Sequence, residues 1–236
     1  MKAIFKRELQ AYFYAPAAYV FMGVFLALGS VFFAVGNLAS RSGDLPSFLW
    51  NMSYLWMLLT PILTMHTYAG ERKARTDQLL YTSPVSMAGV AVGKYLAGCA
   101  VLGLTVLLSA VYALIVALYG KLYVGEALCC YLGFILQGCA FLALDMLVSA
   151  RARTPVTAAL WAFGVNLLLW LLDVLSSAVS VAAVSRALSF VSLYKRYAPF
   201  QQGQLSYASA LYFAAFIALM LFFTVRTLDA RRWRQS

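Results

Sequence analysis

Six long apolar runs, separated by short polar segments, dominate the pattern of this 236-residue chain. Crossing a hydrocarbon core of about 30 Å takes roughly 20 helical residues at about 1.5 Å each. Backbone groups in lipid need internal hydrogen bonds, and unbroken runs of this length favour helices over barrel strands. The expected spans are residues 17–37, 48–68, 87–119, 127–149, 155–175 and 207–225. The pattern predicts an all-α membrane protein whose six transmembrane helices form one domain, residues 1–236.

Composition supports a lipid environment. Hydrophobic residues make up 64% of the chain and charged residues 11%, whereas about a quarter of the residues of a soluble domain are charged. A soluble domain of this length could not bury so much apolar surface. We therefore expect a multi-pass protein surrounded by the lipid bilayer.

The basic residues indicate the orientation. An even number of spans places both termini on one side, and 13 of the 18 Lys and Arg residues fall on that side, against 5 on the other. Cytoplasmic loops carry an excess of Lys and Arg, so both termini and the 71–94 connection are expected in the cytosol. The membrane is expected to be the bacterial inner membrane. The basic residues are scattered along the membrane boundaries rather than gathered in one patch, which disfavours binding to nucleic acid.

Residues 1–15 form a separate amphipathic pattern before the first span. Pro16 divides this segment from the span. A helix lying in the cytosolic interface fits the pattern; a simple extension of the first span is the alternative. Its expected apolar face contains Ile4, Phe5, Leu9 and Tyr12, and its polar positions are Lys2, Lys6, Arg7 and Gln10.

A charged island lies between the second and third spans. Residues 45–70 contain no Asp, Glu, Lys or Arg, and the first charge after Lys94 is Lys121. Glu71 with Arg75, and Lys73 with Asp77, are opposite charges four residues apart, which favours a helix over 71–82. Pro84 should end this helix and Ser86 should cap the next one. A solvated loop that only anchors the topology is the alternative.

The longest connection, residues 176–206, is mostly apolar although it is too short to span twice. Such a segment is typical of re-entrant or interfacial helices that are buried against protein. We expect these helices on the outer side, between the fifth and sixth spans.

Few residues suggest catalytic chemistry. His66 is the only histidine, and residues 89–95 lack the spacing of a phosphate-binding loop. The cysteines lie within spans without C-x-x-C spacing, which favours a packing role. We therefore expect no metal site and no catalytic residues in this chain. These cysteines are Cys99, Cys129, Cys130 and Cys139.

Two acidic residues near span ends are candidates for a polar pathway, because ionisable residues in a membrane are often functional. Asp145 precedes Arg151 on the cytosolic side, and Asp173 lies near the outer end of the fifth span. Both are placed shallow enough to reach the interface or to pair locally. For Asp145 the expected partner is Arg151 or Arg153.

The charged island resembles the membrane permeases of type-2 ABC exporters, particularly the gliding-motility-type and nitrous-oxide-maturation-type permeases. The residues that carry the resemblance are Glu71-Arg72-Lys73, Thr76-Asp77-Gln78-Leu79-Leu80 and Thr82-Ser83-Pro84. Further matches are Lys6-Arg7-Glu8-Leu9 with Pro16, Gly93-Lys94, Phe200-Gln201-Gln202-Gly203, Thr224-Val225-Arg226-Thr227-Leu228 and Arg231-Arg232-Trp233. The chain departs from the family at Asp145-Met146 and at Arg151-Ala152-Arg153-Thr154-Pro155.

The resemblance implies a non-catalytic permease subunit without a nucleotide-binding domain. Its partners would be two copies of a separate ABC ATP-binding subunit, which binds ATP and Mg, and a second permease half in a homodimer or heterodimer. Segment 71–82 would be the coupling helix, and segment 1–15 an elbow helix positioned by Arg7 and Glu8. The implied coupling residues are Glu71, Arg72, Arg75, Thr76, Asp77 and Gln78, with Leu79 and Leu80 seating the helix.

The transported substrate is left open, as is mechanical work on the envelope in place of export. Two other classes of function also remain. One is an ATP-independent carrier or channel that uses Asp145 or Asp173. The other is a membrane assembly scaffold or an intramembrane enzyme, which the lack of a catalytic set disfavours.

Overall fold

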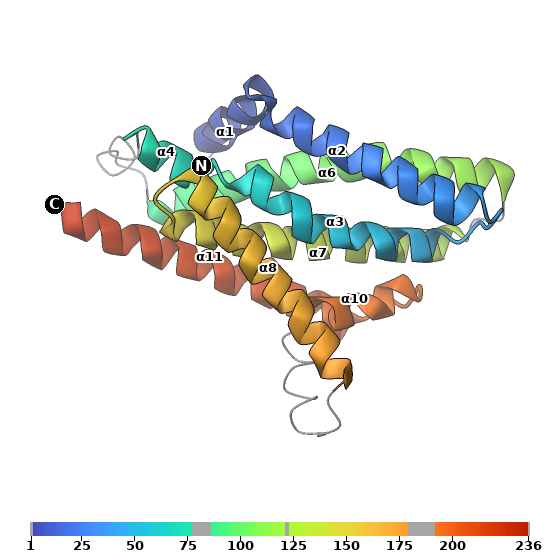
Figure 1. Ribbon diagram of the computed structural model, residues 1–236. Helices are drawn as coiled ribbons and strands as arrows, with labels where there is room; N and C mark the ends of the chain where they lie inside the picture. The colour runs from blue at the N-terminus through green and yellow to red at the C-terminus, as the bar shows by residue number, and fades with distance from the viewer. Residues whose placement is uncertain (1, 77–85, 121–122, 179–191, 236) are drawn as a thin grey trace.

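The structure is a computed structural model that describes residues 2–76, 86–120, 123–178 and 192–235. Within these residues the regular structure is entirely helical (Figure 1). All six expected spans are confirmed as helices long and apolar enough to cross a membrane. They are α2 (Pro16–Phe33, continued by the π-helical Ala34–Leu38), α3 (Leu45–Thr64), α6 (Met87–Tyr119), α7 (Val124–Arg151), α8 (Pro155–Ala178) and α11 (Tyr207–Gln235).

Helices α3 and α7 form the centre of the bundle, and α2, α6, α8 and α11 pack around them. The core is aromatic where they meet. The ring of Trp56 on α3 lies 4.6 Å from Phe25 and 4.8 Å from Phe134, measured between ring centroids. Its indole N–H donates to the carbonyl of Phe134 at 3.2 Å, which satisfies the one polar atom of a fully buried side chain. Helices α8 and α11 leave most of their apolar surface uncovered.

Helix α1 (Lys2–Tyr14) precedes the first span as a separate element, as Pro16 predicts. It packs against the first turns of α6, where Gly93 allows a close approach. A Cβ at this position would lie 3.0 Å from the Ile4 side chain. Leu9 is partly buried in the core, whereas Lys6 is exposed, so the helix is amphipathic as expected. Its position at a membrane surface stays a prediction.

Of the helix predicted over 71–82, the described residues 71–73 are helical and 74–76 are not, because α4 (Ala69–Lys73) ends after five residues. The N–H of Thr76 donates to the carbonyl of Glu71, and the N–H of Arg75 to that of Arg72. This pair of bonds is a Schellman motif, and Arg75 adopts the left-handed φ of 58° that the motif requires. The expected positions Asp77, Gln78, Leu79 and Leu80 lie outside the described residues.

Helix α10 (Leu193–Gln201) is the helix that the structure describes within the long outer connection. Residues 179–191 of this connection lie outside the described residues. It packs against α7, with lesser contacts to α8 and α3. Tyr194, Tyr197 and Phe200 are buried there. The segment is thus helical and buried against protein; its re-entrant character stays a prediction.

Candidate functional site

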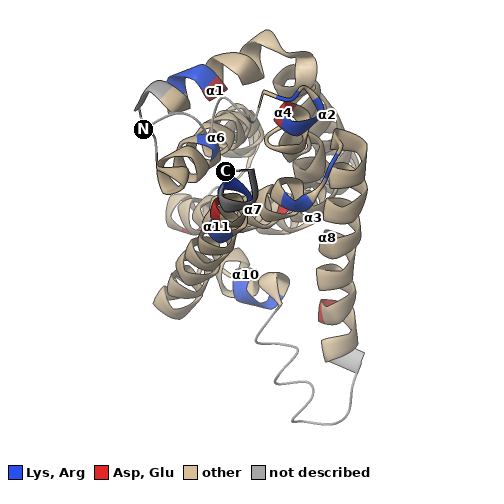
Figure 2. Cartoon of the chain, turned by 90° about the vertical axis from the view of Figure 1, so that its left-hand side faces the viewer, with Lys and Arg blue, Asp and Glu red and all other residues tan. Residues whose placement is uncertain are grey.

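Several charged residues lie at the end of the bundle formed by α1, α4 and the last turns of α11 (Figure 2). Both chain termini are found at this end (Figure 1). Four of these residues, contributed by three helices, form one network of ion pairs. They are Arg7 and Glu8 on α1, Glu71 on α4 and Lys94 on α6.

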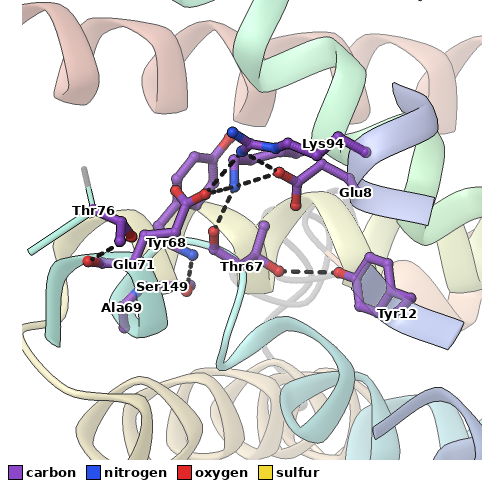
Figure 3. A network of polar contacts seen from close by, with 10 residues as sticks. Glu8, Tyr12, Thr67, Tyr68, Ala69, Glu71, Thr76, Lys94 and Ser149 are labelled. Carbon is purple, nitrogen blue, oxygen red and sulfur yellow. Dashed lines mark hydrogen bonds and ion pairs between the residues drawn. The ribbon is translucent and has the colours of Figure 1, made fainter. Parts of the chain in front are cut away.

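Lys94 is the centre of the network (Figure 3). Its Nζ lies 2.8 Å from Glu71 Oε1 and 3.2 Å from Glu8 Oε1, and it donates to the carbonyl of Thr67 at 2.9 Å. The ring of Tyr68 lies 5.2 Å away. Only 1% of the Lys94 side chain is exposed. An ammonium group so deeply buried would be very costly without a partner, and here two carboxylates neutralise it.

Arg7 closes the network from the solvent side. Its guanidinium lies 2.6 Å from Glu8 Oε1 and 3.1 Å from Glu71 Oε1, and 56% of its side chain is exposed. The hydrogen bond to Glu8 raises the pKa of Arg7 above its usual value, because the bond favours the charged form. Each carboxylate therefore lies between two cations. The two acids and two bases balance, and they tie α1, α4 and α6 together.

Hydrogen bonds at the junction of α3 and α4 extend this connection. The hydroxyls of Tyr12 and Thr67 lie 3.1 Å apart, and burial raises the pKa of Tyr12 to about 12, so its phenol stays neutral. The backbone N–H groups of Tyr68 and Ala69 both approach Ser149 Oγ at 3.4 Å. The junction is thus bonded to α1 on one side and to α7 on the other.

Arg72 points into the protein instead of away from it. Its guanidinium donates to the carbonyl of Ala152 at 2.6 Å and to that of Ala150 at 3.4 Å. Arg231 of α11 donates to the carbonyl of Arg151 at 3.2 Å. Two cations thus satisfy the carbonyls at the end of α7, where the helix dipole favours positive charge. Of the described coupling candidates, Arg75 and Thr76 are the exposed ones.

A cavity of about 400 Å³ lies between α1 and the α3–α4 junction. Glu8, Tyr12 and Glu71 contribute its polar wall, and Leu63 is part of its apolar wall. His66, which is exposed, also borders it. Among the described residues, no group of His, Cys, Asp and Glu side chains could hold a metal ion.

The expected positions of the two membrane acids need one correction. Asp145 makes no ion pair with Arg151 or Arg153 in the described chain; its side chain is fully buried between α3, α7 and α8. Its Oδ2 lies 2.6 Å from Thr60 Oγ1 and 3.3 Å from Asn166 Nδ2. The reason is helical geometry, since six residues at about 100° each turn Asp145 and Arg151 to different faces of α7.

Asp173 contacts a residue of the outer connection. Its carboxylate accepts a hydrogen bond from Ser192, which precedes α10. The two acids therefore do not share a site. Asp145 is bonded within the membrane-spanning bundle, whereas Asp173 joins α8 to the outer connection.

Sequence reasoning did not assign Lys94 to the site, although one signal was available. Lys94 is the only charged residue in α6, and it lies about two turns after the exposed N-cap residue Ser86. A single cation placed among apolar residues implies nearby acids. Thr60 and Asn166 were also missed, because single uncharged polar residues occur in many spans.

The structure is a helical bundle with six candidate membrane spans and a charged network at one end, and the comparisons with known proteins agree with it. No curated protein matches the chain. A family model described as "ABC-2 family transporter protein" matches residues 51–225. The match covers most of the chain and extends from α3 to α11, including α4, Lys94 and Asp145. The chain therefore belongs to the ABC-2 family of transporter proteins, as a membrane-spanning component of an ABC transporter.

Proposed function

We propose that this chain is one permease half of an ATP-driven exporter, coupled to a separate ABC ATP-binding subunit. Two copies of that subunit would bind ATP and Mg, and a second permease half would complete the pathway. Membership of the ABC-2 family supports this interpretation. The excess of basic residues on the side of the termini supports an inner-membrane protein whose charged end faces the cytosol.

One observation carries the coupling proposal: the ion pair between Glu71 and Lys94. These residues flank the stretch that connects α4 to α6, which is the proposed docking segment. Their 2.8 Å contact joins the two ends of that stretch. Glu8 adds α1 to the same ion pair at 3.2 Å. A displacement of the docking segment would therefore move α1, α4 and α6 together.

This arrangement supports a lever between two membrane conformations. ATP binding would close the ATPase dimer and displace the docking segment, and the network would transmit the displacement to the spans. The chain contributes no chemistry to hydrolysis in this scheme; it supplies contacts that differ between the two states. Exposed Arg75 and Thr76 would contact the ATPase, while Glu71 and Arg72 hold the lever to the bundle.

The test uses the full chain purified with its P-loop ATPase in lipid. In Glu71→Gln the shape of the side chain is kept and its charge is lost, so Lys94 retains one carboxylate. We expect the complex to form but its ATPase rate to lose most of the stimulation by the permease. Arg75→Ala should instead weaken co-purification. Arg153→Gln is the matched control, because it removes an exposed cation from the same end.

The proposal fails if no P-loop ATPase co-purifies with the wild-type chain. It also fails if Glu71→Gln and Arg153→Gln give the same coupled ATPase rate as the wild type. A Glu71→Gln complex that forms and hydrolyses ATP without stimulation supports the lever.

A further inference from the structure

A second polar cluster lies within the membrane-spanning bundle, where α3, α7 and α8 meet. It consists of Thr60, Asp145 and Asn166, all with no exposed surface. Asn166 Nδ2 donates to the carbonyl of Met57 at 3.2 Å and lies 3.3 Å from Asp145 Oδ2. The cluster joins three helices through one acid, and the charged network described above has no part in it.

The two short contacts of Thr60 need two hydrogens, and the Thr60 hydroxyl supplies only one of them if Asp145 is ionised. Thr60 Oγ1 lies 2.7 Å from the carbonyl of Trp56 and 2.6 Å from Asp145 Oδ2. Both are full hydrogen-bond distances, yet a hydroxyl has a single hydrogen and a carbonyl can only accept. A carboxylate would leave one of these two close contacts without a hydrogen.

A proton on Asp145 Oδ2 gives every short contact its own hydrogen. The acid then donates to Thr60 Oγ1, and Thr60 donates to the carbonyl of Trp56, its own helix four residues earlier. Asn166 has two amide hydrogens, one for Met57 and one for Asp145 Oδ2. This assignment supplies a hydrogen for each of the four printed contacts, while Asp145 Oδ1 and Asn166 Oδ1 stay buried without a hydrogen-bond partner among the described residues.

The surroundings also favour the neutral acid. Among the described residues, no Lys, Arg or His lies within ion-pair distance of Asp145. Burying a lone carboxylate away from water is far more costly than burying a hydrogen-bonded acid. Titratable or charged groups near the packed helices have other surroundings. His66, between α3 and α4, borders the α1 cavity, and Arg151 on α7 and Arg226 on α11 are exposed. Asp229 follows Arg226 by three residues on α11. Asp173 on α8 contacts Ser192, and Tyr95 and Cys99 on α6 contact Cys139 of α7.

We propose that Asp145 is a proton-binding site within the membrane and that its proton latches α8 to α3 and α7. Along the middle of α8 the fully buried positions are Ala158, Ala162 and Asn166. Pro155 and Ser176 are buried nearer its ends, and Leu169 and Trp170 pack against the core only in part. Small residues permit close packing but bury little area, so the Asn166 contacts account for much of the attachment. Much of the rest of α8 exposes apolar side chains.

Release of the proton and separation of α8 are then one step. The O–H bond at Asp145 Oδ2 breaks, the proton passes to water admitted between α8 and α7, and the remaining carboxylate is hydrated. In the packed state no cation of the described residues lies within ion-pair distance to offset that charge, so alkaline conditions favour separation and acidic conditions favour the closed latch. This inference does not depend on coupling to ATP.

Infrared spectroscopy of the full chain in lipid nanodiscs tests the proton directly. At neutral pH the wild type should show the C=O stretching band of a protonated carboxylic acid. Asp145→Asn should remove this band, and Asp173→Asn should leave it unchanged. Absence of the band in the wild type, or its loss in Asp173→Asn alone, would overturn the proposal.

A labelling experiment tests the latch. Ala162→Cys places a thiol on the buried face of α8, in a chain whose four native cysteines are replaced by alanine. The rate at which this thiol reacts with a water-soluble reagent should rise when the pH is raised from about 6 to about 9. The rise should be larger than in a second chain that carries the same cysteine substitutions together with Asp145→Asn. The Asn variant keeps the amide contacts without a releasable proton, so it corrects for ionisation of the thiol itself. Equal acceleration in both chains would refute the latch.

Discussion

The charged network at the end of the bundle and the Asp145 cluster inside it stabilise buried acids in opposite ways. In the network, Glu8 and Glu71 each contact two cations, and one member, Arg7, is still half in solvent. In the cluster, Asp145 contacts only uncharged partners, Thr60 and Asn166, and none of the three is exposed. The first site balances charges, and the second avoids a charge.

The difference follows from what each place can supply. At the end of the bundle, Arg7 reaches the network from solvent and a four-membered set of charges can close around Lys94. Between α3, α7 and α8 the described side chains offer no cation, so a proton is the least costly way to neutralise Asp145. Removing one charge should therefore harm the network, whereas an uncharged isostere should be tolerated in the cluster.

The largest effect is expected for Lys94→Met. Methionine fills much of the space of the lysine stem but leaves Glu8 and Glu71 side by side, with only the exposed Arg7 to offset them. Breaking a buried ion pair by removing one partner costs about 3 to 5 kcal/mol. Thermal unfolding in lipid or mild detergent, followed by loss of the folded gel-filtration peak, should show a markedly lower midpoint.

A double variant separates charge imbalance from poor packing. Glu71→Gln added to Lys94→Met removes one of the two carboxylates that lost Lys94, so the double variant should recover part of the lost stability. Such a recovery is a coupling energy between residues in direct contact. The alternative is simple additivity: Glu71→Gln lowers the stability of Lys94→Met by as much as it lowers that of the wild type. That result would show that the 2.8 Å contact contributes no coupling.

An intermediate effect is expected for Asp145→Leu. Leucine leaves Thr60 and Asn166 without one hydrogen-bond partner, which costs about 1 to 3 kcal/mol for buried polar groups. Asp145→Asn should cost less than about 1 kcal/mol, because its amide can donate to Thr60 as the protonated acid does. Glu71→Gln likewise replaces an acid by its amide, and it should lower the unfolding midpoint more than Asp145→Asn does. The reverse order of unfolding midpoints would mean that Asp145 is the charged site.

The long elements could be predicted from the sequence because their signals extend over many residues. The predicted third span and α6 share the bounds 87–119, and Ser86 caps the helix through a 3.2 Å bond from the N–H of Gly89. Hydrophobic length and a local cap decide such an element without reference to the rest of the fold. The separate α1 was likewise marked by Pro16.

The partners of the acids could not be predicted, because tertiary contacts outweighed local spacing. Glu71 and Arg75 are four residues apart, but such a pair contributes only about 0.2 to 0.5 kcal/mol. Neutralising buried Lys94 is worth far more, so Glu71 pairs with Lys94, and α4 ends at Lys73. For Asp145, nearness to Arg151 in the sequence was misleading because the two residues lie on different faces of α7.

The smallest effect is expected for Arg7→Gln, the change that tests burial within the network itself. Arg7 and Lys94 contact the same two carboxylate oxygens, but the Arg7 side chain is 56% exposed and that of Lys94 is 1% exposed. Ion pairs open to solvent contribute about 0 to 1 kcal/mol, and salt weakens them. Arg7→Gln should therefore lower the unfolding midpoint slightly at low ionic strength and hardly at all near 1 M salt, where the Debye length is about 3 Å. Lys94→Met should keep most of its effect at both salt concentrations, because the Lys94 side chain is 1% exposed and those of its partners Glu8 and Glu71 are 11% and 19% exposed, so salt screens these contacts little. A loss from Arg7→Gln as large as that from Lys94→Met would show that the charge balance, and not burial, determines the stability of the network.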